Sequence, residues 1–328
     1  MSTDALITIS GPAMGARWTA SLPSSAPTSD LEISLAEVVD RVNLQMSTWR
    51  DDSDLMRLNR APLGAWQDIP EDLMFVLRAS LQMTDQSDGL FDISVGRLVE
   101  AWGFGPAQGK ADPEEIRLHL GRRCKGRRAL ELDPLRGQAR RLSDVSLDLS
   151  GIAKGYAVDL MADTLSAAGV NGFLTGLDGE MRAKGLRPDG QRWAVAIEEP
   201  SRRDRSARAL IEVTDCAVAT SGDYRHFLQI AAGYVSHSMN PRNGGPVQNW
   251  LGSVTVLADT CWQADAWATV LMVLGENAGP PFAAAQNLEA IFYIREGEKI
   301  IEVITRGGQI FRDPPQAAAS GAQLAYRI

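Results

Sequence analysis

The amino-acid sequence predicts a two-lobed α+β fold in which helices pack on β-sheets. Apolar residues recur at helical spacing near the N-terminus, whereas short alternating segments fill the stretch from Phe173 to Val256. With 328 residues, of which 45% are hydrophobic, the chain is long enough to bury a large core. We expect one domain over residues 1–313, followed by a mobile tail over the Ala- and Gln-rich residues 314–328.

Two helices are predicted in the N-terminal part. The segment 30–46 has apolar residues at helical spacing, namely Leu31, Leu35, Val38, Val39 and Val42. Pro70 suits the start of a second helix, whose inward-facing positions are Leu73, Val76, Leu77 and Ser80. Both helices are expected to pack on the first sheet.

A strand, a turn and a helix are predicted around residue 150. Residues 145–149 alternate between apolar and polar, Ser150 and Gly151 interrupt the pattern, and helical spacing then runs from Ile152 to Leu165. The turn would therefore present the free amide groups of a helix start, which favour anions.

Lys154 lies in the first turn of this predicted helix. There it would be a mobile positive charge for a phosphate group or a flavin carbonyl, and Asp148, at the end of the strand, would face the same opening. The segment also fits an ordinary helix start, with Ser150 as the N-cap, Lys154 in solvent and Asp148 in a turn.

The C-terminal half is expected to contain strands, one buried helix and a hairpin. Strands are predicted at 193–197 and 209–213, and the segments 290–294 and 299–304 flank a Gly-containing turn. The apolar stretch 261–274 is typical of a well-buried helix that ends at a glycine.

Asp265 and Thr269 are four residues apart in this helix, so both side-chain oxygens share one face. A carboxylate and a hydroxyl suit Mg²⁺, which prefers oxygen ligands and retains several waters, so a backbone carbonyl near Gly151 would complete the set. An aspartate that complements the helix N-terminus and a threonine bonded to an earlier carbonyl would give the same pattern.

Seven sequence blocks resemble the ApbE family of FAD-dependent protein flavinyltransferases, once labelled thiamine-biosynthesis lipoproteins. They are Met14-Gly15, MSTWRDDSDL at 46–55, DGLFDISVGRLVEAWGFG at 88–105, DLSGIAKGYAVD at 148–159, SGDYRHF at 221–227, SHSMNPRNGGPV at 236–247 and ADAWAT at 264–269. The resemblance implies a fold related to the T-fold class, with mixed and antiparallel sheets flanked by helices. It also implies transfer of FMN from FAD, with Mg²⁺, to a threonine hydroxyl of an acceptor flavoprotein.

The resemblance implies roles for single residues as well. The residues implied to contact the flavin nucleotide are Met14, Trp49, Ala101, Trp102, Gly103, Asp148, Lys154 and Met239. The residues implied to hold the metal are Gly151, through its carbonyl, Asp265 and Thr269.

Two segments depart from the family pattern. In the run His237-Ser-Met-Asn240-Pro-Arg-Asn243-Gly244, an amide replaces the usual carboxylate at Asn240 and Asn243 replaces a threonine. Asn240 cannot act as a base, although it can pair with a flavin edge or order the turn. Asp178-Gly179-Glu180 stands where Gly-Gly-Asp is common, which affects the expected orientation of the substrate.

Three histidines occur in the chain, and His237 is the candidate general base. It adjoins the Pro-Arg-Asn-Gly-Gly turn, and a neutral imidazole there would take the proton from an incoming threonine. His226 and His119 are interpreted as structural or surface residues. Asp265 is expected to be catalytic through the metal that it holds.

The expected reaction follows from the charges of FAD. Mg²⁺ on the pyrophosphate would offset negative charge as the acceptor oxygen attacks the FMN-side phosphorus, and AMP would leave. With water as the nucleophile, the same site would be an FAD pyrophosphatase that gives FMN and AMP. A chain without turnover would be a non-enzymatic FAD-binding protein. The sequence leaves these alternatives open.

Charge and hydropathy restrict the partners. The formal net charge of -8 argues against a nucleic-acid partner, and no apolar stretch is long enough to span a bilayer. The N-terminal segment MSTDALITISGPAMGARW has no basic start, apolar core or lipobox cysteine. A cytoplasmic location is therefore expected, or a periplasmic one if a leader has been removed.

Overall fold

The structure is a computed structural model that describes residues 5–105, 111–121, 126–201, 206–224, 227–230, 233–312 and 324–327. The chain divides into two compact units. The first comprises Met1–Val39, Lys154–His226 and Asn249–Ile328, and the second comprises Asp40–Ala153 and Phe227–Gln248. Helices occur together with largely antiparallel sheets, which confirms the predicted α+β class.

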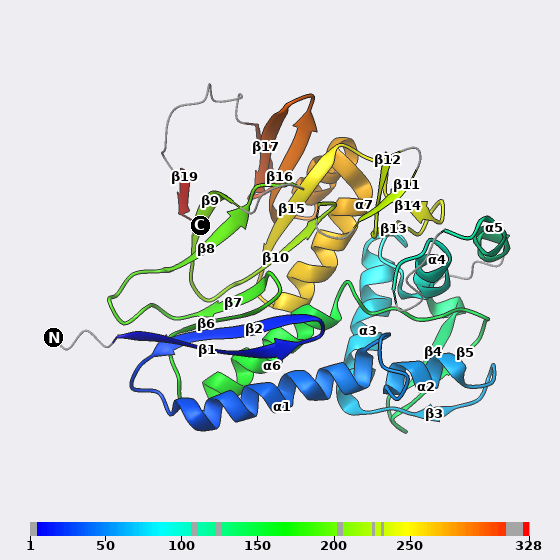
Figure 1. Ribbon diagram of the computed structural model, residues 1–328, viewed down its shortest axis with the longest axis horizontal. Coiled ribbons are helices and arrows are strands. Elements are labelled where there is room, and N and C mark those ends of the chain that lie inside the picture. Colours follow the sequence, from blue (N-terminus) through cyan, green and yellow to red (C-terminus); the bar gives the residue numbers. More distant parts are fainter. Residues whose placement is uncertain are drawn as a thin grey trace. The chain divides into compact units, whose positions relative to one another are not determined.

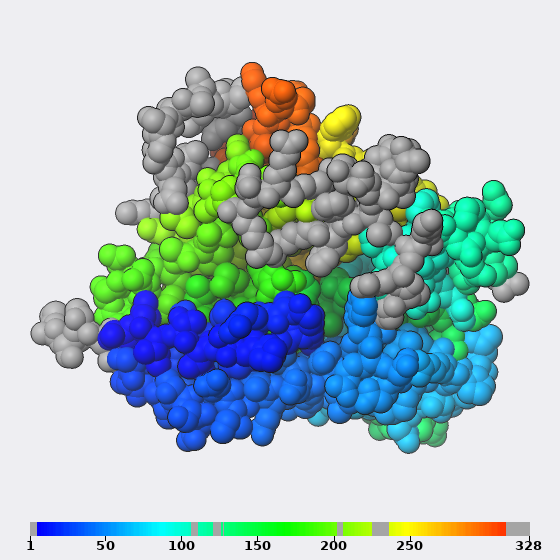
Figure 2. Space-filling model, viewed as in Figure 1, coloured from blue at the N-terminus to red at the C-terminus, as the bar shows by residue number. Residues whose placement is uncertain are grey.

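An antiparallel nine-stranded sheet is the framework of the first unit (Figure 1), with the order β1-β2-β6-β7-β10-β15-β16-β17-β18. Its strands are β1 (Leu6–Ala13), β2 (Ala16–Pro23), β6 (Phe173–Leu177), β7 (Glu180–Lys184), β10 (Ala217–Gly222), β15 (Leu251–Ala258), β16 (Glu289–Glu296), β17 (Lys299–Arg306) and β18 (Gln309–Arg312). The hairpin of β1 and β2 forms one edge of this sheet, and Figure 2 shows its residues at the surface.

Helices cover one face of this sheet. They are α6 (Ala153–Ala167), α7 (Cys261–Ala285) and the N-terminal part of α1 (Thr28–Met46). Buried side chains of α1 and α6 join those of β1, β2 and β6 in one apolar cluster, while α7 packs along β10 and β15. Figure 1 shows α7 running beside these two central strands.

A small three-stranded sheet covers the opposite face. It consists of β8 (Trp193–Glu198), β9 (Ala207–Val213) and β19 (Leu324–Arg327), with β19 parallel and β8 antiparallel to β9. The alternation along β10 shows the two faces, because Ala217 joins the helix-side cluster whereas Val218 joins the cluster under β8 and β9. The central strand β15 is therefore apolar along most of its length.

The second unit combines several helices with short strands. Its helices are α2 (Asp54–Arg60), α3 (Glu71–Gln86), α4 (Gly96–Ala101) and α5 (Pro113–Gly121), with 3-10 turns at Ile93–Val95 and Gly126–Arg128. Its strands are β3 (Gln67–Asp68), β4 (Leu130–Asp133), β5 (Gln138–Arg141), β11 (Phe227–Ile230), β12 (Gly233–Ser236), β13 (Met239–Asn240) and β14 (Gly245–Pro246).

Most of the strongly periodic predictions are confirmed. The helices expected at 30–46, after Pro70 and at 261–274 correspond to α1, α3 and α7, and the expected hairpin corresponds to β16 and β17. Gly275 does end regular helical geometry in α7, because its φ of 74° lies in the left-handed region, and a further helical segment follows.

The strand predicted at 145–149 is wrong, because this segment has no strand partner and no regular secondary structure. Its backbone groups are satisfied by other means. Asn59 donates to the Leu147 carbonyl at 2.9 Å and accepts from the Leu147 N–H at 2.8 Å. The Asp148 N–H donates to the Ile93 carbonyl at 2.8 Å. The alternation of apolar and polar residues here corresponds to alternating buried and half-buried positions, in a segment that is not paired in a sheet.

Two expectations concern the chain as a whole. Of the predicted tail, residues 324–327 form β19, whereas residues 314–323 and 328 lie outside the described residues. Among the helices within the described ranges, none is both long enough and apolar enough to cross a membrane.

We expect Asn59→Ala to lower the free energy of unfolding by about 2–4 kcal/mol. The reason is that both the N–H and the carbonyl of Leu147 would lose their hydrogen-bond partner, and each buried polar group left without a partner costs about 1–3 kcal/mol. Urea denaturation monitored by tryptophan fluorescence would measure the loss. The matched control is Asn277→Ala, whose exposed amide contacts its neighbour Glu276, and it should change the stability by less than about 0.5 kcal/mol. Equal effects of the two variants would contradict the assigned role of Asn59.

Candidate functional site

Lys154 lies in the first turn of α6, as predicted, but its ammonium group is held between carboxylates. The Lys154 Nζ atom lies 2.8 Å from Glu180 Oε1 and 3.3 Å from Asp178 Oδ2. Both acids flank the turn into β7, and Asp178 has a φ of 57°, a left-handed conformation that aspartate tolerates better than most residues. In this structure Lys154 is therefore a paired cation rather than the mobile charge expected from the sequence.

The charges around Lys154 reinforce this pairing. Burial alone would lower the pKa of Lys154, yet its pKa is raised because the carboxylates of Glu180, Asp265 and Asp178 stabilise the ammonium. Lys154 therefore stays protonated at neutral pH.

Asp265 lies on α7 and is buried, with 5% of its surface exposed. Its Oδ2 atom accepts a hydrogen bond of 3.1 Å from the Gly155 N–H, one of the free amides at the start of α6. Burial raises the pKa of Asp265 to about 7, and the negative charge of Glu180 adds to this effect, whereas Lys154 and the Gly155 N–H act in the opposite direction. The positive charge near the Asp265 carboxylate is thus too small to offset its burial and the negative charge of Glu180.

A glycine permits this approach of α6 to α7. A Cβ atom at Gly155 would overlap the Cys261 carbonyl and lie 2.8 Å from the Trp262 Cα atom. Because Gly155 has no side chain, the first turns of the two helices come into backbone contact. The residue is thus required for the hydrogen bond to Asp265.

The residues around Asp265 fit a divalent cation. Within the described part of the chain, Glu180 Oε2 is buried and has no hydrogen-bond partner, and the nearby carboxylates of Asp178, Glu180 and Asp265 outnumber Lys154. Thr269, one turn beyond Asp265 on α7, is half-buried. The described ranges hold no group of three His, Cys, Asp or Glu side chains placed to bind a metal. Oxygen ligands of other types and waters commonly complete a Mg²⁺ site.

The second unit brings together two of the predicted segments. Trp102 Nε1 donates a 3.2 Å hydrogen bond to the Gly244 carbonyl, so the Ala101-Trp102-Gly103 turn is fastened to the Pro-Arg-Asn-Gly-Gly turn. Gly103 has a φ of 85°, which a side chain would oppose. Met239 is buried in the short strand β13, directly before the latter turn.

The two amides that depart from the family pattern order this turn. Asn240 Oδ1 accepts from the Arg242 N–H at 2.8 Å, and Asn243 Oδ1 accepts from the Gly245 N–H at 2.9 Å. The guanidinium of Arg242 also pairs with Asp88 at 2.8 Å. Side-chain oxygens that accept from an amide two residues later stabilise turns, so Asn240 has a local role that needs no basic carboxylate.

The remaining predicted site residues are distributed over the two units. In the first unit, Met14 has a φ of 46° at the turn between β1 and β2 and packs on the apolar cluster there. In the second, Trp49 is 61% exposed, while Asp148, Gly151 and His237 are half-buried. Asp148 accepts a hydrogen bond from the Ser150 N–H, which is the turn role left open above. His226 lies outside the described residues.

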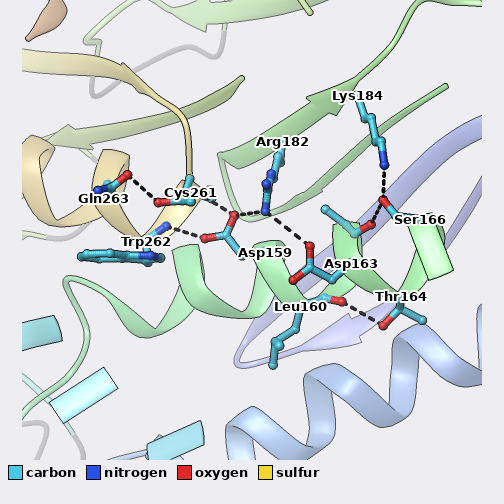
Figure 3. A network of polar contacts seen from close by, with 12 residues as sticks. Asp159, Leu160, Asp163, Thr164, Ser166, Arg182, Lys184, Cys261, Trp262 and Gln263 are labelled. Atoms are coloured by element: carbon cyan, nitrogen blue, oxygen red, sulfur yellow. Dashed lines mark hydrogen bonds and ion pairs between the residues drawn. The ribbon is translucent and has the colours of Figure 1, made fainter. Parts of the chain in front are cut away.

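Sequence reasoning missed three participants. In the sequence, Asp178 and Glu180 stand out only as a departure from the family pattern, whereas in the structure their carboxylates hold Lys154. Asp159 stands in a block that resembles the family without an implied role, and in the structure it contacts the start of α7 (Figure 3). The available signal for Asp159 is that it is the single charged residue in the apolar stretch 155–162 of α6.

Comparisons with known proteins agree on one family. The sequence model of the ApbE family matches residues 14–292. A Vibrio cholerae relative named FAD:protein FMN transferase is 35% identical over 291 residues, covering 88% of this chain and 87% of the relative. A Salmonella typhimurium relative of the same name is 31% identical over 297 residues, covering 88% and 85%. The crystal structure of apo flavinyl transferase ApbE from Pseudomonas stutzeri superposes with a TM-score of 0.83 at 32% identity, covering 93% of this chain and 96% of that chain.

We expect Asp265→Asn to raise the melting temperature of the metal-free chain at pH 8 by about 2–4 °C, the shift that corresponds to about 1 kcal/mol. The change removes a buried negative charge near Glu180, while the amide oxygen still accepts from Gly155. Added Mg²⁺ should raise the melting temperature of the wild type but not that of the variant. Differential scanning fluorimetry would measure both effects.

Thr269→Val serves as the companion variant, because it removes a hydroxyl and leaves the charge of the cluster unchanged. It should reduce the response to Mg²⁺ without the stabilisation seen in Asp265→Asn. A Mg²⁺ response of Asp265→Asn as large as that of the wild type would rule out this cation site.

Proposed function

The chain belongs to the ApbE family, and from this membership we propose that it is an FAD:protein FMN transferase that attaches FMN to a threonine of an acceptor protein. FAD is the donor, AMP is released, and Mg²⁺ is required. The observation that supports the proposal is the excess of buried carboxylate around Asp265, because a phosphate-transfer site needs a cation and such a cluster would attract one.

Asp265 and Thr269 are the proposed side-chain ligands of the cation, and the Gly151 carbonyl remains the predicted third ligand. When bound, Mg²⁺ supplies positive charge that stabilises the charge developing on the pyrophosphate. Lys154 offsets part of the negative charge of Glu180 and Asp178. The cluster therefore keeps a net negative charge for the cation, while two of its carboxylates have a positively charged partner.

The proposed chemical step exchanges one phosphorus–oxygen bond for another. The threonine oxygen forms a bond to the FMN-side phosphorus, and the bond from that phosphorus to the bridging oxygen breaks. AMP leaves with the electron pair, and His237 accepts the threonine proton. The product is a phosphoester between FMN and the threonine side chain.

The flavin nucleotide is the second ligand to be held. We assign the apolar surfaces of Trp102 and Met239 to the flavin, because an aromatic face and a thioether both suit a heteroaromatic ring. The resemblance is the ground for proposing Met14, Trp49, Ala101, Gly103 and Asp148 as further contacts of the nucleotide. The bond from Trp102 to Gly244 supports the assignment, since it fixes the indole against the turn that follows Met239.

We expect the full chain, mixed with FAD and Mg²⁺, to attach FMN to an acceptor protein. The acceptor is the flavin-free form of a protein whose mature form carries phosphoester-linked FMN on threonine. Intact-mass spectrometry should show a gain of one FMN on the acceptor, with one AMP released for each label. Asp265→Ala should abolish both products. Release of AMP without labelling would identify a pyrophosphatase, and intact bound FAD would identify a binding protein without turnover.

We expect His237→Gln to lower the transfer rate by about 10²–10⁴-fold, the usual contribution of a general base, while FAD still binds. Quenching of FAD fluorescence would measure binding, and a time course of acceptor mass would measure the rate. His119→Gln is the matched control, because His119 lies on α5 beside Glu115 at 3.0 Å and has no proposed role in transfer. Equal rates for the two variants would remove His237 from the mechanism.

A further inference from the structure

Asp159, on α6, fastens the first residues of α7. Its carboxylate is buried, with 6% of the residue exposed. Asp159 Oδ1 accepts from the Cys261 N–H and Oδ2 accepts from the Trp262 N–H, each at 2.9 Å (Figure 3). These are the first two residues of α7, whose amides have no partner within the helix. A single side chain thus satisfies two amides and places negative charge at the positive end of the helix.

The same carboxylate also joins α7 to the sheet. Arg182, on β7, donates from Nη1 to Asp159 Oδ1 at 2.7 Å. Arg182 follows Glu180 by two residues on this strand, and Glu180 is the partner of Lys154. One buried carboxylate therefore connects α6, α7 and β7, the three elements that carry the cluster around Asp265.

The contacts between α6 and α7 are reciprocal. Asp159 on α6 accepts from the first amides of α7, and Asp265 on α7 accepts from the Gly155 N–H in the first turn of α6. Between these two contacts, Gly155 meets the backbone of Cys261 and Trp262. The position of one helix along the other is consequently set at two points about one helical turn apart.

We propose that Asp159 is a positioning residue for the cation site, which fixes where α7 presents Asp265 and Thr269 without contacting the cation itself. The proposal rests on the proposed function in one respect, namely that these two residues hold a divalent cation. Residues that orient the ligands of a metal commonly change its affinity by about 10–100-fold when they are replaced. The carboxylate is suited to this role because hydrogen bonds to an ionised acceptor are short and strong.

The test compares Asp159→Asn with Asp163→Asn in the full chain. In Asp159→Asn, one side-chain oxygen still accepts hydrogen bonds, and an NH₂ group replaces the other oxygen. This NH₂ group faces another donor, either a backbone N–H or Arg182, so the start of α7 must shift. Asp163 is the matched control, because it lies on the same helix and 3.8 Å from the same guanidinium. Its side chain is 71% exposed, and within the described residues it makes no hydrogen bond to α7. Mn²⁺ serves as the probe, without FAD or acceptor.

We expect Asp159→Asn to raise the dissociation constant for Mn²⁺ by about tenfold or more, measured from free Mn²⁺ by electron paramagnetic resonance well below the melting temperature. Asp163→Asn should stay close to the wild type. Hydrogen exchange followed by mass spectrometry should show faster exchange at the start of α7 in Asp159→Asn alone. A residue that only stabilised the fold would lower the melting temperature and leave the Mn²⁺ affinity of the folded chain unchanged.

Two results would overturn the inference in distinguishable ways. Wild-type Mn²⁺ affinity in a folded Asp159→Asn variant would overturn the positioning role alone. A wild-type chain that binds no Mn²⁺ would overturn the proposed cation site and this inference with it. If Asp159→Asn does not fold, Arg182→Gln replaces it, because it loosens the same carboxylate. Its Mn²⁺ affinity should fall in the same direction, and an unchanged affinity would contradict the proposal.

Discussion

The backbone contact between the first turns of α6 and α7 is the constraint on which the candidate site depends. Gly155 permits it, because any larger residue would overlap Cys261 and Trp262. The contact brings free amides at the start of each helix within reach of a carboxylate on the other. Both carboxylates lose solvation on burial, and the amides and nearby cations offset only part of that cost.

The two carboxylates differ in how many partners offset their charge. Burial raises the pKa of Asp159 as well, while two backbone amides and the Arg182 guanidinium act in the opposite direction. Asp265 has one backbone amide and shares Lys154 with Glu180 and Asp178. A buried charge without a matching partner is costly, and residues that break this rule are expected mainly at functional sites, which is why we propose ligand binding at Asp265. The same comparison explains why we assign ligand binding to Asp265 and orientation to Asp159.

The sequence allowed prediction of those parts of the fold that depend on local periodicity. Helices α1, α3 and α7 and the hairpin of β16 and β17 have repeating apolar positions that identify them without knowledge of their partners. The segment 145–149 has a similar local pattern, but its backbone partner is Asn59, which lies 88 positions from Leu147 in the sequence. A pattern within five residues has no information about a side chain so distant.

The same limit applies to the site. The spacing of Asp265 and Thr269 predicts that they share one face of a helix, and both residues lie on α7. The partners of Lys154 and Asp159 could not be predicted, because they come from β7 and α7 and meet these residues only through tertiary structure. In the sequence, Asn240 and Asn243 are notable only because they replace a carboxylate and a threonine of the family pattern. In the structure each accepts a hydrogen bond within its own turn.

The separation of α6 from α7 along the chain also constrains when the site can form in the cell. A ribosome releases the N-terminal end first, and α7 begins 108 positions after the first residue of α6, at Cys261. Until Asp265 has emerged, the nascent chain lacks one of its two proposed side-chain ligands and the helix that Asp159 orients. The proposed cation site can therefore assemble only after α7 has been synthesised, and translation products that stop before α7 would lack it.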